Sequence, residues 1–336
     1  EGRSLPVCPR FLLAASVIQI SLDGLARLWY AIKIQATKGV IFIESLLFCL
    51  KSLVLGIVEG ITEFLPISST GHLIVFENLL GFHGSEQYIN TYSYVIQLGA
   101  ILAVIVLYRQ KIFATLQNLF PKKENGQWTR PYAETGLRFW ITLAIACIPG
   151  FVGVMLLGDL ADAYLFNAVS VAIVLVLGGV AMILAERFCR KQASPLQSGR
   201  WLHVSTRQAL VIGGFQCLSI IPGMSRSAST IIGGWFAGLS TAASAEFSFF
   251  LAIPVMLGMS VLKLIQLGGF GSMSSLELVS LAIGFVVSFL VALIVVKKFI
   301  AFLQKKSLTV FAVYRIIFGL FVLLLWLLGA VTMTPV

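Results

Sequence analysis

Long apolar runs separated by short polar loops occupy most of the chain from residue 44 to the C-terminus. A helix needs about 20 apolar residues to cross a bilayer, and six runs approach or exceed that length. These runs lie at about residues 92–108, 136–158, 166–187, 242–263, 275–298 and 308–330. The pattern predicts an all-α polytopic membrane protein with six full spans.

Two more apolar regions are too short to span a bilayer and are interrupted by acidic residues, proline or glycine. Each region contains a pair of half-length segments, at 44–58 with 68–80 and at 206–221 with 225–238. Such pairs are typical of re-entrant hairpins, which enter a membrane and return to the same side. The sequence therefore predicts four half-helices in addition to the six spans.

Among the loops that separate the apolar runs, basic residues are found in alternate ones. The loops that carry Lys and Arg lie at 109–138, 187–207 and 297–306, and the loops without them lie at 81–91, 159–165 and 266–276. Because Lys and Arg are enriched on the cytoplasmic side, the basic loops are predicted to be cytoplasmic. The two hairpins then enter from opposite faces, and each is followed by three spans. This is the layout of an inverted repeat, over residues 44–187 and 206–330, whose two broken regions should meet in one site.

Composition supports this interpretation. Only 11% of residues are charged and 58% are hydrophobic, whereas soluble domains carry about 25% charged residues. The net charge of +10 comes from the alternate loops and forms no basic face, so no nucleic-acid partner is expected. Five cysteines without CxxC spacing indicate neither a disulfide framework nor a zinc site. Residues 1–43 precede the single membrane domain of residues 44–336, as a leader, a tag remnant or an amphipathic surface helix.

The first interrupted region reads EGITEFLPISSTGH over residues 59–72. Glu59 and Glu63 are four residues apart, which places them on one face of a helix. Two neighbouring carboxylates suit a divalent cation, a proton-transfer role or both, and the alternative is a solvated pair at a helix end. Ionisable residues inside a membrane are costly, which favours a functional role.

Three consecutive hydroxyls, at Ser68, Ser69 and Thr70, precede the half-helix that carries His72. One or two of them would serve as helix caps in any protein. A hydroxyl at a helix start beside a base is also how a phosphoryl acceptor would be placed. His72 either assists this group or is a core residue with satisfied hydrogen bonds.

The second interrupted region reads PGMSRSAST over residues 222–230. Arg226 cannot lose its charge and needs an anion, which is either one of the two glutamates or a phosphate. The hydroxyls of Ser225, Ser227 and Thr230 surround it in sequence. Two other charged residues are expected to have no role in the site, since Glu186 would be solvated at a span boundary and Arg315 would extend to the cytoplasmic headgroups.

Both motifs closely resemble the signatures of the BacA-type undecaprenyl-diphosphatase family, the bacitracin resistance proteins. The resemblance runs from about residue 44 to the C-terminus. One departure is Ala228, where the family usually has glycine after the SRS triplet.

The resemblance implies an enzyme that converts undecaprenyl diphosphate to undecaprenyl phosphate and inorganic phosphate. This reaction recycles the carrier lipid for peptidoglycan synthesis and confers bacitracin resistance, since bacitracin competes for the same lipid. The enzyme would be a multi-pass protein of the bacterial inner membrane with its active site facing the periplasm, and a homodimer is compatible with the resemblance.

The resemblance also assigns roles to individual residues. Glu59 and Glu63 would bind a divalent cation, Mg²⁺ or Ca²⁺, or transfer protons, and Arg226 would hold the diphosphate. Ser69 or His72 would be the nucleophile. The remaining hydroxyls would bind substrate, and these are Ser68, Thr70, Ser225, Ser227 and Thr230. The alternative function is a lipid-phosphate transporter or flippase, because inverted repeats with broken helices are typical of transporters.

Overall fold

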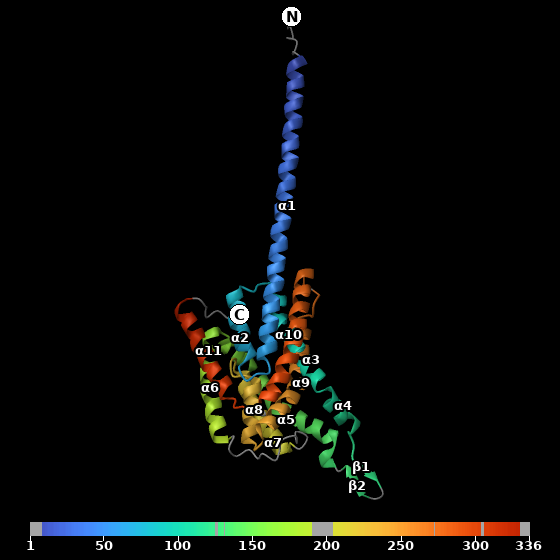
Figure 1. Ribbon diagram of the computed structural model, residues 1–336, viewed down its shortest axis with the longest axis vertical. Coiled ribbons are helices and arrows are strands. Elements are labelled where there is room, and N and C mark those ends of the chain that lie inside the picture. Colours follow the sequence, from blue (N-terminus) through green and yellow to red (C-terminus); the bar gives the residue numbers. More distant parts are fainter. Residues whose placement is uncertain are drawn as a thin grey trace. The chain divides into compact units, whose positions relative to one another are not determined.

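The computed structural model describes residues 9–124, 127–130, 132–189, 204–271, 273–303 and 306–329 (Figure 1). The chain divides into two compact units, residues 1–50 and residues 51–336. Helix α1 begins at Pro9 and ends at Thr62, so its last twelve residues belong to the second unit. All the other helices lie in the second unit, and only that unit bears on the site.

The second unit is built almost entirely from α-helices. After α1 these are α2 (Ser69–Leu80), α3 (Glu86–Leu107), α4 (Arg109–Gln117), α5 (Gly136–Leu165), α6 (Ala168–Cys189), α7 (Thr206–Gln216), α8 (Arg226–Phe236), α9 (Thr241–Gln266), α10 (Ser275–Leu303) and α11 (Thr309–Leu327). Two 3₁₀ helices, η1 (Tyr132–Glu134) and η5 (Cys217–Ile220), and an antiparallel pair of strands, β1 (Lys122–Glu124) and β2 (Gln127–Arg130), complete the described elements.

Seven of the described helices are long and apolar enough to cross a membrane, which confirms an all-α multi-pass membrane protein. Six of them, α3, α5, α6, α9, α10 and α11, coincide with the six predicted spans. The seventh is the Gly39–Thr62 part of α1. Its segment 44–58 was expected as a half-length helix, but the helical backbone continues without a break on its N-terminal side.

Glycines allow the long helices of the second unit to pack closely. An added Cβ at Gly99 on α3 would lie 2.4 Å from the carbonyl oxygen of Phe285 on α10. An added Cβ at Gly56 would lie 2.7 Å from the carbonyl oxygen of Gly284, also on α10. Small residues let helix backbones approach in membranes, where burial of apolar side chains against lipid gives little driving force. Helix α10 is thereby held between α3 and the end of α1.

Two short helices, α2 and α8, begin in the same unusual way. The residue before each helix is a serine with a φ angle of 72°, Ser68 in one case and Ser225 in the other. Each serine caps its helix, because its side chain accepts a hydrogen bond from the backbone N–H three residues later. A positive φ is unfavourable for a residue with a side chain and is concentrated at functional sites.

The long basic loop after α3 contains secondary structure, namely α4 and the β1–β2 hairpin. Within the second unit, this hairpin lies at the opposite end from the connection between α2 and α3 (Figure 1). That connection belongs to a loop that lacks Lys and Arg. The two kinds of loop are therefore separated as the charge pattern requires, while the assignment of the basic loops to the cytoplasm stays a prediction.

Candidate active site

The two interrupted regions meet through their loops. The first loop, residues 63–68, joins α1 to α2, and the second loop, residues 221–225, joins η5 to α8. Arg226 donates a hydrogen bond from Nη2 to Oε1 of Glu63 at 2.9 Å. The hydroxyl of Ser227 donates to the carbonyl oxygen of Leu65 at 3.0 Å. The prediction that the two polar stretches come together is confirmed.

Ser69 and Glu63 form the shortest contact of the site that involves a hydroxyl. Ser69 is the first residue of α2, and its Oγ donates to Oε2 of Glu63 at 2.5 Å. Because Arg226 holds the other oxygen of the same carboxylate, Glu63 connects a hydroxyl to a guanidinium. Ser69 and Glu63 are both buried, at 9% and 7% exposure. A carboxylate in this position can accept the serine proton.

His72 is held differently. Its Nδ1 lies 2.7 Å from the carbonyl oxygen of Ser68, and its Nε2 lies 2.8 Å from the hydroxyl of Tyr314. Since a carbonyl only accepts, Nδ1 carries the proton and Nε2 accepts from Tyr314. The ring also stacks on Phe318, with 4.1 Å between ring centroids. Both nitrogens are therefore occupied, and the imidazole fixes the first loop to α11.

Arg226 begins α8 and points toward the first loop. Besides Glu63, its guanidinium donates to the carbonyl oxygen of Ser248 at 3.3 Å and contacts the sulfur of Met256 at 3.3 Å. Its side chain is 11% exposed. The ion pair with Glu63 is the structural pairing that the sequence left open, and Arg226 nevertheless lines a pocket between the two loops.

The five other hydroxyls divide into two groups. Ser68, Thr70 and Ser225 line the pocket between the loops. Ser227 bonds to the first loop, and Thr230 shares a short hydrogen bond of 2.6 Å with Ser248 inside the α8–α9 contact. The geometry therefore places the first three where a ligand would contact them, and it uses the last two to hold α8.

Arg315 corrects a prediction from the sequence. It was expected to extend to the headgroups, but it is 0% exposed. Its guanidinium donates to the carbonyl oxygens of Gly223 at 2.9 Å, Met224 at 3.0 Å and Pro66 at 3.4 Å. These acceptors belong to both loops. The missed signal was depth, since seven residues into a helix correspond to about 10 Å, too far for easy access to the surface.

Glu186 was also expected to be solvated and is instead 6% exposed. Its carboxylate accepts hydrogen bonds from the hydroxyls of Ser307 and Thr309 and from the backbone N–H of Leu308. It therefore anchors the start of α11, and it lies outside the pockets of the site.

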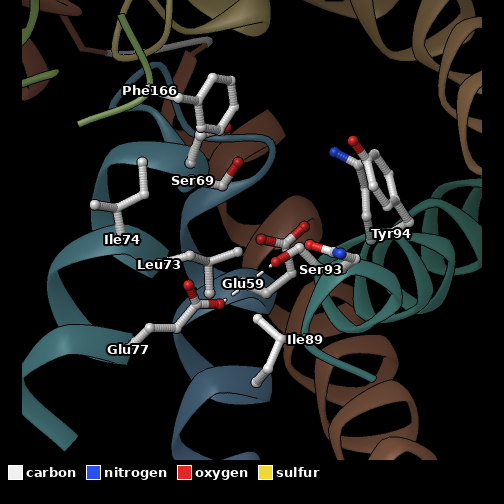
Figure 2. Close-up of a pocket in the computed structure, with 12 residues that line it drawn as sticks. Glu59, Ser69, Leu73, Ile74, Glu77, Ile89, Ser93, Tyr94 and Phe166 are labelled. Carbon is white, nitrogen blue, oxygen red and sulfur yellow. Dashed lines mark hydrogen bonds between the residues drawn. The ribbon is translucent and has the colours of Figure 1, made fainter. Parts of the chain in front are cut away.

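Two adjoining pockets surround Ser69. The first, of about 240 Å³, lies between the two loops and is lined by Glu63, Ser69 and Arg226 among others. The second, of about 200 Å³, lies among α1, α2 and α3 and is shown in Figure 2. Ser69 and Thr70 line both. We refer to them as the loop pocket and the acidic pocket.

Glu59 lines the acidic pocket and differs sharply from Glu63. It is 1% exposed, and neither of its carboxylate oxygens has a hydrogen-bond partner among the described residues. A buried carboxylate without partners must be neutralised by a proton or a cation. The carboxylate of Glu59 is thus suited to bind the predicted divalent cation. No group of three His, Cys, Asp or Glu side chains forms a metal site within the described ranges, so any cation here would need other oxygen ligands.

Comparison with known proteins identifies a family. The family model described as bacitracin resistance protein BacA matches residues 52–321. An undecaprenyl-diphosphatase of Ruminiclostridium cellulolyticum is 55% identical over 287 residues, which is 85% of this chain and 99% of that protein. A second, from Clostridium tetani, is 47% identical over 85% of this chain and its own full length. A third, from a Thermoanaerobacter species, is 46% identical over 82% of this chain and 96% of its own. The match spans both loops and every helix that carries a site residue, and the chain belongs to the BacA family of bacitracin resistance proteins.

Proposed function

We propose that the chain is an undecaprenyl-diphosphatase, which hydrolyses undecaprenyl diphosphate to undecaprenyl phosphate and inorganic phosphate. The relatives that carry this name match almost their entire lengths to it. The observation that carries the mechanism is the chain of contacts from Ser69 through Glu63 to Arg226. These three side chains line one pocket, and in the proposed mechanism they serve as nucleophile, base and anion-binding group.

Ser69 is proposed as the nucleophile. Its Oγ attacks the terminal phosphorus, and its proton passes to Oε2 of Glu63 as the new O–P bond forms. The bond between that phosphorus and the bridging oxygen breaks, and undecaprenyl phosphate leaves with the proton from Glu63. Water then attacks the phosphorus of the phosphoserine and gives a proton to the Glu63 carboxylate, which passes it to Oγ of Ser69 as the Ser69 O–P bond breaks. Inorganic phosphate is released and Ser69 is restored.

His72 is the rival nucleophile, and the geometry favours Ser69. Both imidazole nitrogens are engaged, by the Ser68 carbonyl and by the Tyr314 hydroxyl. Ser69 lines both pockets. We therefore assign His72 a positioning role, in which it fixes the backbone immediately before the nucleophile.

Arg226 is proposed to bind the diphosphate. Its guanidinium has five N–H donors, and a phosphoryl group in the loop pocket would meet the donors that Glu63 leaves free. The first residues of α2 and α8, Ser69 and Arg226, also line this pocket, and the N-terminal end of a helix favours anions. Catalysis would consist mainly of stabilising charge on the transferring phosphoryl group.

A divalent cation, Mg²⁺ or Ca²⁺, is proposed as cofactor because the unpaired carboxylate of Glu59 needs neutralisation and lies beside Ser69. When bound, it would neutralise phosphate charge during transfer. Glu63 was predicted as a second ligand, but each of its oxygens already has a partner in the site.

The inverted repeat is likewise proposed. Its support is the matching start of α2 and α8, where a capping serine with φ 72° precedes each helix. Three spans follow each helix in the chain order, α3, α5 and α6 after α2, and α9, α10 and α11 after α8. An active site that faces the periplasm is also proposed, and its support is the resemblance to the BacA family.

Purified protein in detergent should release phosphate from undecaprenyl diphosphate, and a colorimetric phosphate assay measures this directly. The transporter alternative predicts movement of the lipid across liposomes without phosphate release. Absence of release from wild-type protein that is folded and supplied with Mg²⁺ or Ca²⁺ would overturn the proposed function.

A further inference from the structure

The acidic pocket contains a second carboxylate that the sequence motifs do not include. Glu77 lies on α2 eight residues after Ser69, so that Ser69, Leu73 and Glu77 share one helix face. All three line the acidic pocket together with Glu59 of α1. Figure 2 shows Glu59, Glu77 and Ser93, from three different helices, directed into the same space.

The described lining of this pocket carries acidic side chains without a basic one. Among the described residues that line it there are two glutamates and no lysine, arginine or histidine. Glu59 has no hydrogen-bond partner, and Glu77 accepts one long hydrogen bond, 3.4 Å from the hydroxyl of Ser93. Two carboxylates that share a small pocket repel each other unless a cation lies between them or one takes a proton. Glu63, by contrast, has its own arginine.

The other polar groups of the pocket come from one face of α3. Asn90, Ser93 and Gln97 are spaced three and four residues apart and supply amide and hydroxyl oxygens. Carboxylate, amide and hydroxyl oxygens are the ligands of hard cations such as Mg²⁺ and Ca²⁺. The lining described by the structure offers neither thiolate nor imidazole, which does not suit Zn²⁺ or Cu²⁺.

We propose that Glu59 and Glu77 are the paired carboxylate ligands of a divalent hard cation, with oxygens of Asn90, Ser93 and Gln97 completing its shell. Because Ser69 lines both pockets, this cation would lie next to the phosphoryl acceptor. This inference rests on the proposed function and gives it a metal site that uses Glu77 in place of Glu63.

Direct binding tests the proposal without substrate. Full-length protein in detergent is freed of metal with a chelator and titrated with Mg²⁺ and then Ca²⁺ by calorimetry. Glu77→Gln and Glu59→Gln are each expected to weaken binding at least about tenfold, in line with the loss of a charged ligand. Glu134→Gln is the matched control, since it removes the same charge from an exposed loop residue, and it should bind metal like the wild type.

Glu77→Asp is a second variant, which keeps the charge and shortens the side chain. It should bind more tightly than Glu77→Gln, and thermal unfolding confirms that each variant is folded. Wild-type affinity in folded Glu77→Gln, or no binding in the wild type, would overturn the site. If the Glu59 and Glu77 variants bind metal more weakly than the wild type, but the wild type releases no phosphate, the proposed function fails and the cation site stands. If the wild type releases phosphate in a metal-dependent way and Glu77→Gln binds the metal as tightly as the wild type, the proposed cation site fails and the proposed function stands.

Discussion

The two loops of the site share a backbone design and differ in chemistry. Each ends in a serine with φ 72° that caps a short helix. The residue that follows is Ser69 in the first loop and Arg226 in the second. The same backbone conformation thus precedes a hydroxyl side chain, that of Ser69, and a guanidinium side chain, that of Arg226. The two loops therefore match in the backbone conformation of their last residue and differ in the side chain that follows it.

The acids extend this difference. Glu63, Glu59 and Glu77 all belong to the first half, and the cation that opposes Glu63 comes from the second. In the proposed mechanism, the reacting groups come from the first loop and the helices on either side of it, and Arg226 at the start of α8 anchors the anion. The following changes test this division of labour, beginning with the largest expected effect.

Ser69→Ala should abolish phosphate release almost completely, by roughly 10³-fold or more, because it removes the nucleophile. Steady-state phosphate release measures the loss. Ser229→Ala is a suitable control, because among the described residues the Ser229 hydroxyl bonds to a local backbone group alone, the carbonyl oxygen of Ser225 at 2.9 Å. A Ser69→Ala protein with near-normal turnover would move the nucleophile elsewhere, with His72 the next candidate.

Arg226→Lys should lower turnover by about 10²-fold, because the charge remains but the two-pronged donor geometry is lost. The unfolding temperature should change little, since an ammonium can still pair with Glu63. Kinetics and thermal unfolding of the same preparation separate the two effects. Normal turnover would reduce Arg226 to a counter-ion of Glu63 and remove the second loop from the chemistry.

Arg315→Met should destabilise the protein by about 3 kcal/mol, since the carbonyls of Gly223 and Met224 each lose a charged donor in a buried place. The measurement is the thermal unfolding midpoint in detergent. Arg109→Met is the control, because Arg109 is exposed and bonds only to the nearby carbonyl of Val106. Equal midpoints for the two variants would contradict the view that Arg315 holds both loops.

Ser68→Gly and Ser225→Gly should have the smallest effect and should resemble each other. Glycine adopts a positive φ without strain, which offsets the lost cap and the greater freedom of the unfolded chain. Each change should alter stability by less than about 1 kcal/mol. Differential scanning calorimetry on both variants compares them. Opposite signs at the two positions would mean that the loops are not equivalent.

Hydropathy alone was sufficient for the spans, because a bilayer requires a continuous apolar surface and leaves no other arrangement of the backbone. The meeting of the two loops was also predictable, from the charge of alternate loops. The continuation of α1 on the N-terminal side of residue 44 was missed, because charged residues interrupt the apolar pattern at Asp23, Arg27, Lys33 and Lys38. No proline lies between residues 23 and 38 to end the helix.

The hydrogen-bond partners of individual polar side chains were harder to predict from the sequence. The partner of His72 is Tyr314, 242 residues away, and the acceptors of Arg315 are backbone carbonyls, which leave no trace in the sequence. Glu77 lies outside both motifs, so its position on the Ser69 face of α2 became informative only once α1 and α3 were placed beside it. The positive φ of Ser68 was hidden for a related reason, since glycine and not serine usually signals it.

The contacts of Arg315 have a mechanical consequence. The guanidinium of Arg315 joins the first loop to the second. The Glu63–Arg226 and Ser227–Leu65 contacts are two further hydrogen bonds between the two regions. A carrier that alternately opens its centre to either side of a membrane must let such loops slide past each other. In this protein such a movement would have to break all of these hydrogen bonds at the same time. These linked loops therefore favour a single arrangement of the site. In the proposed function, the lipid headgroup would move to the site without a movement of one loop past the other.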